Sequence, residues 1–182
     1  MAHNGSPGID NFKFFQSIDP WTALQDGRRQ LIDALDACDP RLAMQMLTIP
    51  EFANWGDSTG PLSALLLAHA ERDRAHAAFF ASLNAGDTTR TSTPSTGVIA
   101  GDWAAVRSEI DAARFAMLEA AANLSPECWE RPLFPPWEGI VEEYLPSLLI
   151  VRAMCDGILA GAIAALTPAV PVPSPARQGH AR

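Results

Sequence analysis

Apolar residues recur at spacings of three and four along most of the chain, the period that places side chains on one face of an α-helix. The pattern predicts an all-α protein with four long helices. We expect these helices over residues 20–37, 61–83, 103–123 and 140–166. The periodicity is clearest in the second of them, and Pro146 predicts a kink in the last.

Residues suited to helix starts stand ahead of three of these segments. Asp19 is placed as an N-cap of the first helix, with Pro20 at the first helical position that Pro prefers. Asp102 stands in the same way before the third helix, and Thr59 or Ser58 before the second. Capping and periodicity therefore predict the same helix boundaries.

The segments between the helices contain many turn-forming residues. Residues 40–47 predict a short helical segment, and residues 48–60 a turn-rich connector that carries Trp55. Residues 84–101 are rich in Thr, Ser and Gly and predict a long exposed loop. The proline-rich stretch 131–139, which contains Trp137, predicts irregular structure.

An imperfect internal repeat divides the chain into two halves. Leu62, Leu65, Leu66, His69 and Asp73 recur as Leu145, Leu148, Leu149, Arg152 and Asp156, because 145−62 and 156−73 both equal 83. A second register, offset by 86, aligns Arg28 with Arg114. Repeats are decisive for architecture. Each half reads as a helix, a linker with a Trp, and a second helix, so that the two halves predict an up-down four-helix bundle.

Ionisable residues lie on the apolar faces of the second and fourth helices. At about 100° per residue, His69, Asp73 and His76 fall within roughly 60° of one another and near the leucines. Arg152 and Asp156 align with the apolar stripe of the last helix in the same way. Burying an unpaired charge is costly, so we expect His69, Asp73, Arg152 and Asp156 to form a central polar site.

Two arrangements of this site remain open from the sequence. His69, Asp73 and Asp156 are suitable ligands for a divalent metal such as Ni, Zn or Mn, with water at the open positions. In the other arrangement, Arg152 bridges Asp73 and Asp156, and His69 bonds a carboxylate or the loop carrying Trp55 or Trp137. The permanent charge of Arg152 favours this ionic network over the metal.

Charge and composition narrow the range of partners. The chain has 182 residues, with 21 acidic against 13 basic, a formal charge of −8 and no basic cluster, which argues against direct nucleic-acid binding. Three widely spaced cysteines and a polar N-terminus without a secretory signal predict a cytoplasmic protein with reduced thiols. Prolines interrupt the apolar stretch 157–172, so no membrane span is expected there, and its GxxxG pattern at 157–161 is interpreted as close helix packing.

The same considerations predict one folded domain with two extensions. Residues 1–19 are expected to form an N-terminal arm, residues 20–166 the helical bundle, and residues 167–182 a disordered proline-rich tail.

Residues 21–166 resemble the DinB/YfiT-like superfamily, which includes thiol-dependent S-transferases and mycothiol-dependent maleylpyruvate isomerases. The matching features are the first helix at 28–35, Trp55 followed by residues 60–69, residues 103–124 and a final helix. The resemblance implies a four-helix bundle with a pseudo-repeat, often dimeric, whose members often bind a divalent metal through three histidines. It assigns His69 as the second-helix ligand. Arg152 and Asp156 stand where the family's HxxxH pair is expected, so the metal triad is degenerate.

These features leave two main functions open, and with them the question of whether the protein is an enzyme. The first is a divergent metal-dependent transferase or hydrolase that acts on a small molecule, with metal-bound water as nucleophile or base. The second is a non-catalytic small-ligand-binding or stress-related scaffold with a buried ionic network in place of the metal. A third, an interaction protein, would use the tail and the acidic surface. A homodimer is expected in each case.

Overall fold

The protein is mostly helical, which confirms the predicted all-α class. The computed structural model describes residues 18–55, 58–86, 100–131, 133 and 140–166. Its elements are α2 (Pro20–Ala37), η1 (Pro40–Met44), β1 (Met46–Thr48), η2 (Pro50–Trp55), β2 (Thr59–Pro61), α3 (Leu62–Asn84), α4 (Trp103–Ala122), α5 (Pro126–Trp129) and α6 (Val141–Leu166). The predicted arm up to residue 17, the tail 167–182 and Trp137 lie outside the described residues, as does the side chain of Trp55.

The predicted caps of α2 and α4 are confirmed. The Asp19 carboxylate accepts a hydrogen bond from the backbone N–H of Thr22 at 3.0 Å, and Asp102 accepts one from Ala105 at 3.0 Å. Each bond satisfies one of the backbone donors that a helix start leaves without an intrahelical partner.

The predicted cap of α3 by Thr59 or Ser58 is wrong. The helix starts at Leu62, and its N-cap is Pro61, which makes no side-chain capping bond. Thr59 instead lies in β2, which pairs antiparallel with β1 in the register Met46↔Pro61 to Thr48↔Thr59. The N–H of Leu62 donates to the carbonyl of Gln45, the residue before β1, at 2.9 Å, so this bond satisfies one of the free backbone donors of the helix start.

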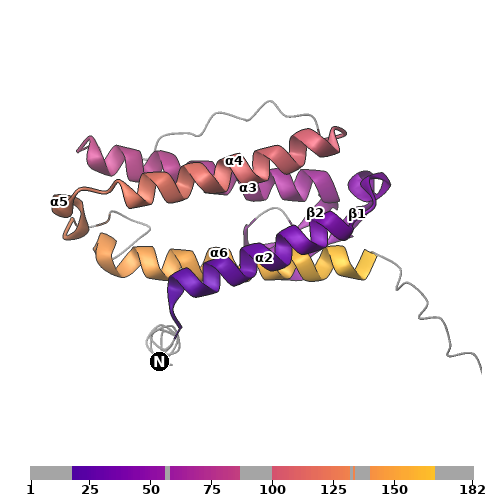
Figure 1. Ribbon diagram of the computed structural model, residues 1–182, viewed down its shortest axis with the longest axis horizontal. Helices are drawn as coiled ribbons and strands as arrows, with labels where there is room; N and C mark the ends of the chain where they lie inside the picture. The colour runs from indigo at the N-terminus through magenta and orange to yellow at the C-terminus, as the bar shows by residue number, and fades with distance from the viewer. Residues whose placement is uncertain (1–17, 56–57, 87–99, 132, 134–139, 167–182) are drawn as a thin grey trace, which may run out of the picture.

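The four long helices form two pairs, α2 with α6 and α3 with α4, stacked as two layers (Figure 1). Within the first pair Gly27 approaches Ala153 and Gln30 approaches Gly157, so α2 and α6 run parallel. Within the second pair Asp73 bonds Arg114 and Asn84 bonds the carbonyl of Asn123, so α3 and α4 are parallel as well.

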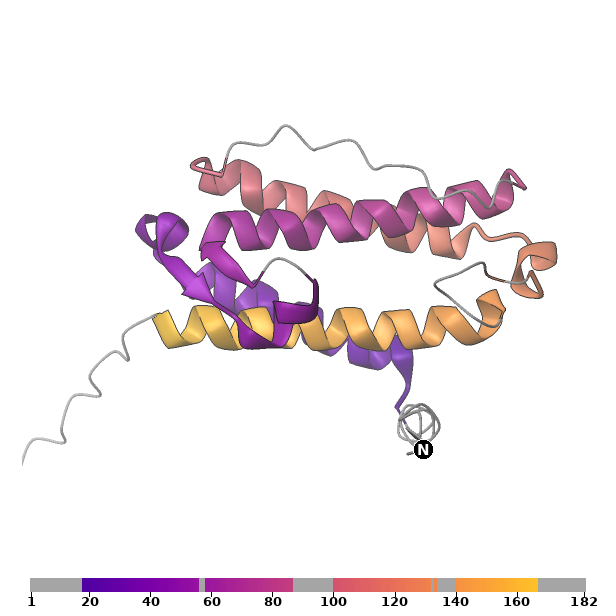
Figure 2. The same cartoon turned by 180° about the vertical axis from the view of Figure 1, so that it is seen from behind.

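The two layers run in opposite directions. The ion pairs of Arg28 with Asp111 and of Asp36 with Arg107 join α2 to α4 in antiparallel order. The chain therefore runs up, down, down and up, which differs from the predicted up-down alternation. Figure 2 shows that α3 ends and α4 begins at opposite ends of the molecule.

The apolar core consists of two clusters on either side of a central polar layer. One cluster includes Leu31, Leu66, Ile110 and Leu159, and the other includes Phe80, Met117, Leu145 and Leu149. All four long helices contribute to both clusters. On α4, Arg114 lies between Ala113 of the first cluster and Met117 of the second, and on α3 and α6 the layer residues lie where one cluster gives way to the other.

Close helix packing occurs at Gly27 and not at the predicted GxxxG pattern. A Cβ on Gly27 would lie 2.5 Å from the carbonyl oxygen of Ala153, which no side chain can accept without backbone movement. A Cβ on Gly157 would meet only the end of Gln30 at 3.6 Å, and one on Gly161 would meet nothing within 4 Å. The interpretation of residues 157–161 as a close contact is therefore wrong.

Among the described residues, α6 is the helix whose length and apolar composition would allow it to cross a membrane. Of its most apolar window, 56% is buried within the protein, and a core helix of a soluble protein passes the same test. Prolines were expected to interrupt the apolar stretch 157–172. They follow Leu166, the last residue of α6, and so do not shorten this helix.

Candidate functional site

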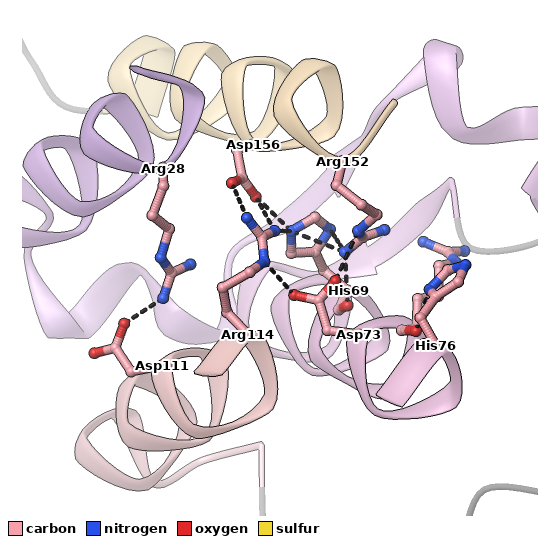
Figure 3. A network of polar contacts seen from close by, with 9 residues as sticks. Arg28, His69, Asp73, His76, Asp111, Arg114, Arg152 and Asp156 are labelled. Carbon is pink, nitrogen blue, oxygen red and sulfur yellow. Dashed lines mark hydrogen bonds and ion pairs between the residues drawn. The ribbon is translucent and has the colours of Figure 1, made fainter. Parts of the chain in front are cut away.

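The central polar layer brings together the four residues predicted from the sequence and adds Arg114. His69 and Asp73 come from α3, Arg114 from α4, and Arg152 and Asp156 from α6 (Figure 3). The relative exposures of these five residues are 0% for His69 and Asp156, 1% for Asp73, 2% for Arg152 and 4% for Arg114. The layer is thus almost completely removed from solvent.

Helix geometry explains how α3 and α6 supply two groups each. His69 and Asp73 are four residues apart, as are Arg152 and Asp156, so each pair projects from one side of its helix. Because α3 and α6 run in opposite directions, His69 lies beside Asp156 and Asp73 lies beside Arg152. His69 also contacts Arg152.

A neutral His69 bonded to an ionised Asp156 is one centre of the layer. His69 Nε2 lies 2.6 Å from Asp156 Oδ1. Burial and the charge of Arg152 lower the pKa of His69 to about 4, against the opposing effect of Asp156. Burial raises the pKa of Asp156, but the hydrogen bond from His69 and the charge of Arg114 prevail and bring it to about 2. These directions assign the proton to Nε2, which donates to Asp156 and leaves Nδ1 as an acceptor.

Arg114 is the second centre and bridges the two carboxylates. Its Nε donates to Asp73 Oδ2 at 2.7 Å, while Nη1 and Nη2 donate to the two oxygens of Asp156 at 2.9 and 3.0 Å. The fork of a guanidinium suits such bidentate pairing. Burial lowers the pKa of Arg114, but the two carboxylates outweigh it and raise the value.

The prediction that Arg152 bridges the two aspartates is therefore wrong in its choice of arginine. Arg152 Nη2 lies 2.9 Å from His69 Nδ1 and 3.0 Å from the carbonyl oxygen of His69, to which it donates. Arg152 Nε lies 2.7 Å from Asp73 Oδ1, close enough for an ion pair. The same two atoms have no hydrogen-bond partner among the described residues, so this contact is electrostatic and lacks hydrogen-bond alignment.

The five side chains balance their charges. Two guanidinium groups face two carboxylates around a neutral imidazole, so the layer carries no net charge. Burial raises the pKa of Asp73, but Arg152 and Arg114 outweigh it and keep the pKa below its usual value. A buried charge is costly unless it is paired, and every charge of the layer has an oppositely charged partner, although Asp73 Oδ1 and Arg152 Nε meet without a hydrogen bond.

Two signals in the sequence pointed to Arg114, although the predicted site did not include it. It occupies the apolar stripe of α4, four residues after Ile110 and three before Met117, both of which are buried. It is also aligned with Arg28 by the second register of the repeat. Arg28 itself pairs with the exposed Asp111 at the edge of the layer, and its Nη1 is buried without a hydrogen bond among the described residues.

The hydrogen bond of His76 is made within α3. Its Nδ1 lies 2.6 Å from the carbonyl oxygen of Arg72, one turn earlier on the same helix. The side chain is half-buried, in agreement with its predicted place nearer the surface.

The predicted metal ligands His69, Asp73 and Asp156 are neighbours, but this arrangement does not fit a divalent ion. Their ligand atoms face Arg114 and Arg152 at 2.7 to 3.1 Å, and these permanent cations would repel a metal at the same place. Within the described ranges no group of three or more His, Cys, Asp or Glu side chains is arranged to hold a metal ion.

The nearest thiol offers no activated nucleophile. Cys155 precedes Asp156 on α6 and is completely buried. Burial raises the pKa of Cys155 to about 11, so the thiol stays protonated at neutral pH, and a thiol is a weak nucleophile compared with its thiolate.

No protein-family model, curated protein or solved structure matches this chain.

Proposed function

We propose that this chain is a non-catalytic, DinB-like four-helix bundle in which a buried ionic layer replaces a metal site. In this proposal the layer holds the two helix pairs together, and the protein acts as a scaffold whose function lies on its surface. The observation that carries the proposal is the bridge that Arg114 makes between Asp73 and Asp156.

The bridge supports a structural role because Arg114 occupies one oxygen of Asp73 and both oxygens of Asp156. A reaction at this site would require a group whose charge or proton changes during turnover. Here the pKa values of the carboxyls are lowered by their arginine partners, and the pKa of His69 by its burial and Arg152. All three groups therefore keep one protonation state near neutral pH.

The structural role is also supported by the number of helices that the layer joins. His69 of α3 bonds Asp156 of α6, and Arg114 of α4 bonds both of those helices. A network that joins three helices at the middle of the molecule restricts which helix faces which.

The same proposal includes the expectation of a cytoplasmic protein. The three cysteines are free and buried, and the structure brings no two of them together as a disulfide. A reducing compartment agrees with free thiols.

Elemental analysis of the untagged protein tests this proposal. The protein is incubated in turn with Ni²⁺, Zn²⁺ and Mn²⁺, desalted, and measured beside Asp156→Ala and beside Asp111→Ala, a carboxylate at the exposed edge of the layer. We expect far less than one metal ion per chain in all three proteins. Near-stoichiometric metal that is lost only in Asp156→Ala would contradict the proposal and favour the metal-dependent hydrolase or transferase.

A further inference from the structure

The guanidinium of Arg28, at the edge of the central layer, has one nitrogen without an acceptor. The side chain reaches from α2 toward α4 and is 14% exposed (Figure 3). Its Nη2 donates to Asp111 Oδ1, whereas its Nη1 is buried and has no hydrogen-bond partner among the described residues. A buried donor without an acceptor is costly, so a further acceptor at Nη1 would stabilise the folded protein.

Asp111 uses only part of the hydrogen-bonding capacity of Arg28. Their contact joins one nitrogen to one oxygen, whereas a guanidinium can bind a carboxylate or phosphate through two parallel N–H···O bonds. The Asp111 side chain is 65% exposed, and an ion pair with so exposed a partner contributes little to stability. An oxyanion that engages both Nη1 and Nη2 can therefore displace Asp111 into solvent.

The charge balance at this edge also favours an anion. The five residues of the central layer are neutral together, and Arg28 adds a further guanidinium beside them. The neighbouring ion pair between α2 and α4, Arg107 with Asp36, is balanced in itself. Only the mostly exposed Asp111 compensates Arg28 in the described contacts, so the buried side of the edge has an excess of positive charge.

Two exposed aromatic side chains flank Arg28 on the same edge. Phe115 follows Asp111 by one helical turn on α4, and Trp21 precedes Arg28 by two turns on α2. Because α2 and α4 are antiparallel, both aromatic residues are displaced from the ion pair toward the same end of the molecule. Phe115 is 68% exposed and Trp21 45%, while Leu24, between Trp21 and Arg28, belongs to the buried core.

We propose that Arg28 binds the oxyanion group, carboxylate or phosphate, of a small molecule whose apolar body lies against Phe115 and Trp21. Asp111 occupies this position until the ligand displaces it. The inference goes beyond the proposed scaffold function. It concerns the edge between α2 and α4 and not the bonds of the layer, so its failure would leave the outcome of the metal analysis unchanged.

Ligand-observed NMR titration with benzoate and acetate at neutral pH and constant ionic strength tests this site. Benzoate carries the proposed carboxylate and an aromatic body, and acetate carries the carboxylate alone. Benzoate should bind saturably and more tightly than acetate by roughly 2- to 10-fold, the range expected for an added aromatic contact. Phe115→Ala should reduce this difference. Absence of saturable benzoate binding to the natural chain would overturn the proposal.

Four variants examine the role of Arg28. Arg28→Ala should abolish saturable binding. Arg29→Ala is the matched control and should leave binding unchanged, because Arg29 is exposed and pairs with Asp26 on its own helix. Asp111→Ala should tighten benzoate binding by up to about fivefold, since it removes the competing carboxylate of an exposed ion pair.

Arg28→Lys separates binding from folding, because it keeps the charge but not the fork of the guanidinium. Circular dichroism should show natural helix content in this variant, and its benzoate binding should be weaker. Unchanged benzoate affinity in both Arg28→Lys and Asp111→Ala would overturn the proposal.

Phenyl phosphate, titrated beside benzoate, distinguishes the two oxyanions. Tighter binding of phenyl phosphate would support the site and assign it to a phosphate, and tighter binding of benzoate would assign it to a carboxylate. Binding of both probes that persists in Arg28→Ala would place them elsewhere on the protein and contradict the proposal.

Discussion

At the scale of single residues, the central layer depends on how five almost fully buried side chains satisfy one another. Arg114 makes three bonds to two carboxylates, and His69 connects Asp156 to Arg152. Removing one member of such a set leaves its partners charged and unpaired in a region from which water is excluded. Removing a charge from the layer should therefore lower the free energy of unfolding far more than removing a charge from the surface.

Arg114→Ala should lower the free energy of unfolding by about 3 to 5 kcal/mol, because Asp73 and Asp156 lose their shared cation while they stay buried. Urea denaturation followed by circular dichroism measures this change. The matched control is Arg107→Ala, which removes the exposed ion pair with Asp36 and should cost less than about 1 kcal/mol. Equal losses in the two variants would contradict a structural role for the layer.

Acid should weaken the folded state through His69. Its pKa of about 4 in the folded protein lies below the ordinary 6.5, so between these values the unfolded chain binds a proton that the folded protein does not. The contribution of neutral His69 to the free energy of unfolding is therefore fully present above about pH 6.5. It falls as the pH drops toward 4, by up to about 1.4 kcal/mol per pH unit. Asp156, with its pKa lowered from 3.8 to about 2, adds a further loss between those two values.

Urea midpoints measured from about pH 7.5 down to about pH 4.5 test this dependence on the His69 proton. The variant His69→Gln should lose most of the slope in this range, whereas His76→Gln should retain it because His76 lies outside the layer. A slope that survives in His69→Gln would assign the pH dependence to other groups.

At the scale of the elements, the helices start where local chemistry directs them, but their packing depends on single close contacts. Asp19 and Asp102 cap α2 and α4 as the sequence predicts. The start of α3 instead depends on a hairpin between residues 46–48 and 59–61. The contact between α2 and α6 depends on Gly27, which the helical periodicity does not single out.

Gly27→Ala should lower the free energy of unfolding by about 1 to 3 kcal/mol, because the new Cβ overlaps the backbone of Ala153 and forces α2 away from α6. Thermal and urea unfolding measure the change. Gly161→Ala is the matched control, since its Cβ meets nothing within 4 Å and Ala is the better helix former by roughly 0.5 to 1 kcal/mol. Loss of stability in both variants would mean that the close approach at Gly27 is not the cause.

At the scale of the whole molecule, the helices run up, down, down and up, so the length of the connection between α3 and α4 decides whether one chain can form this arrangement. α3 has 23 residues and is about 35 Å long, so the connection must span nearly that distance to place α4 beside it in parallel. A chain with the same helices and a shorter connection could not fold on itself in this way.

Deleting residues 88–97 leaves only 85–87 and 98–102 between the two helices, a reach of about 32 Å at most. In this variant α4 cannot reach its place beside α3 of the same chain, so we expect α4 of a second copy to pack there. The particle should then be larger than that of the natural chain at unchanged helix content, measured by light scattering and circular dichroism. Replacing the same ten positions with Gly and Ser at full length is the control and should behave as the natural chain. A stable monomer after the deletion would contradict the parallel arrangement of α3 and α4.

The helical class, the bounds of α2 and α4, and four of the five buried residues of the central layer follow from the sequence without further information. These properties depend on neighbours within one or two turns, and the 3.6-residue period and the caps report them directly. For the same reason the inward-facing His69, Asp73, Arg152 and Asp156 could be predicted from the sequence alone, because a polar residue in an apolar stripe is a local signal.

Which helix lies beside which, and in which direction, is a property of the three-dimensional packing. Arg114 bridges the aspartates because α4 runs parallel to α3, and Gly27 matters because α2 runs along α6. Contacts between segments more than 40 residues apart leave no periodic signal in the chain, since many pairings would bury the same stripes. Packing and the balance of buried charge select one of them.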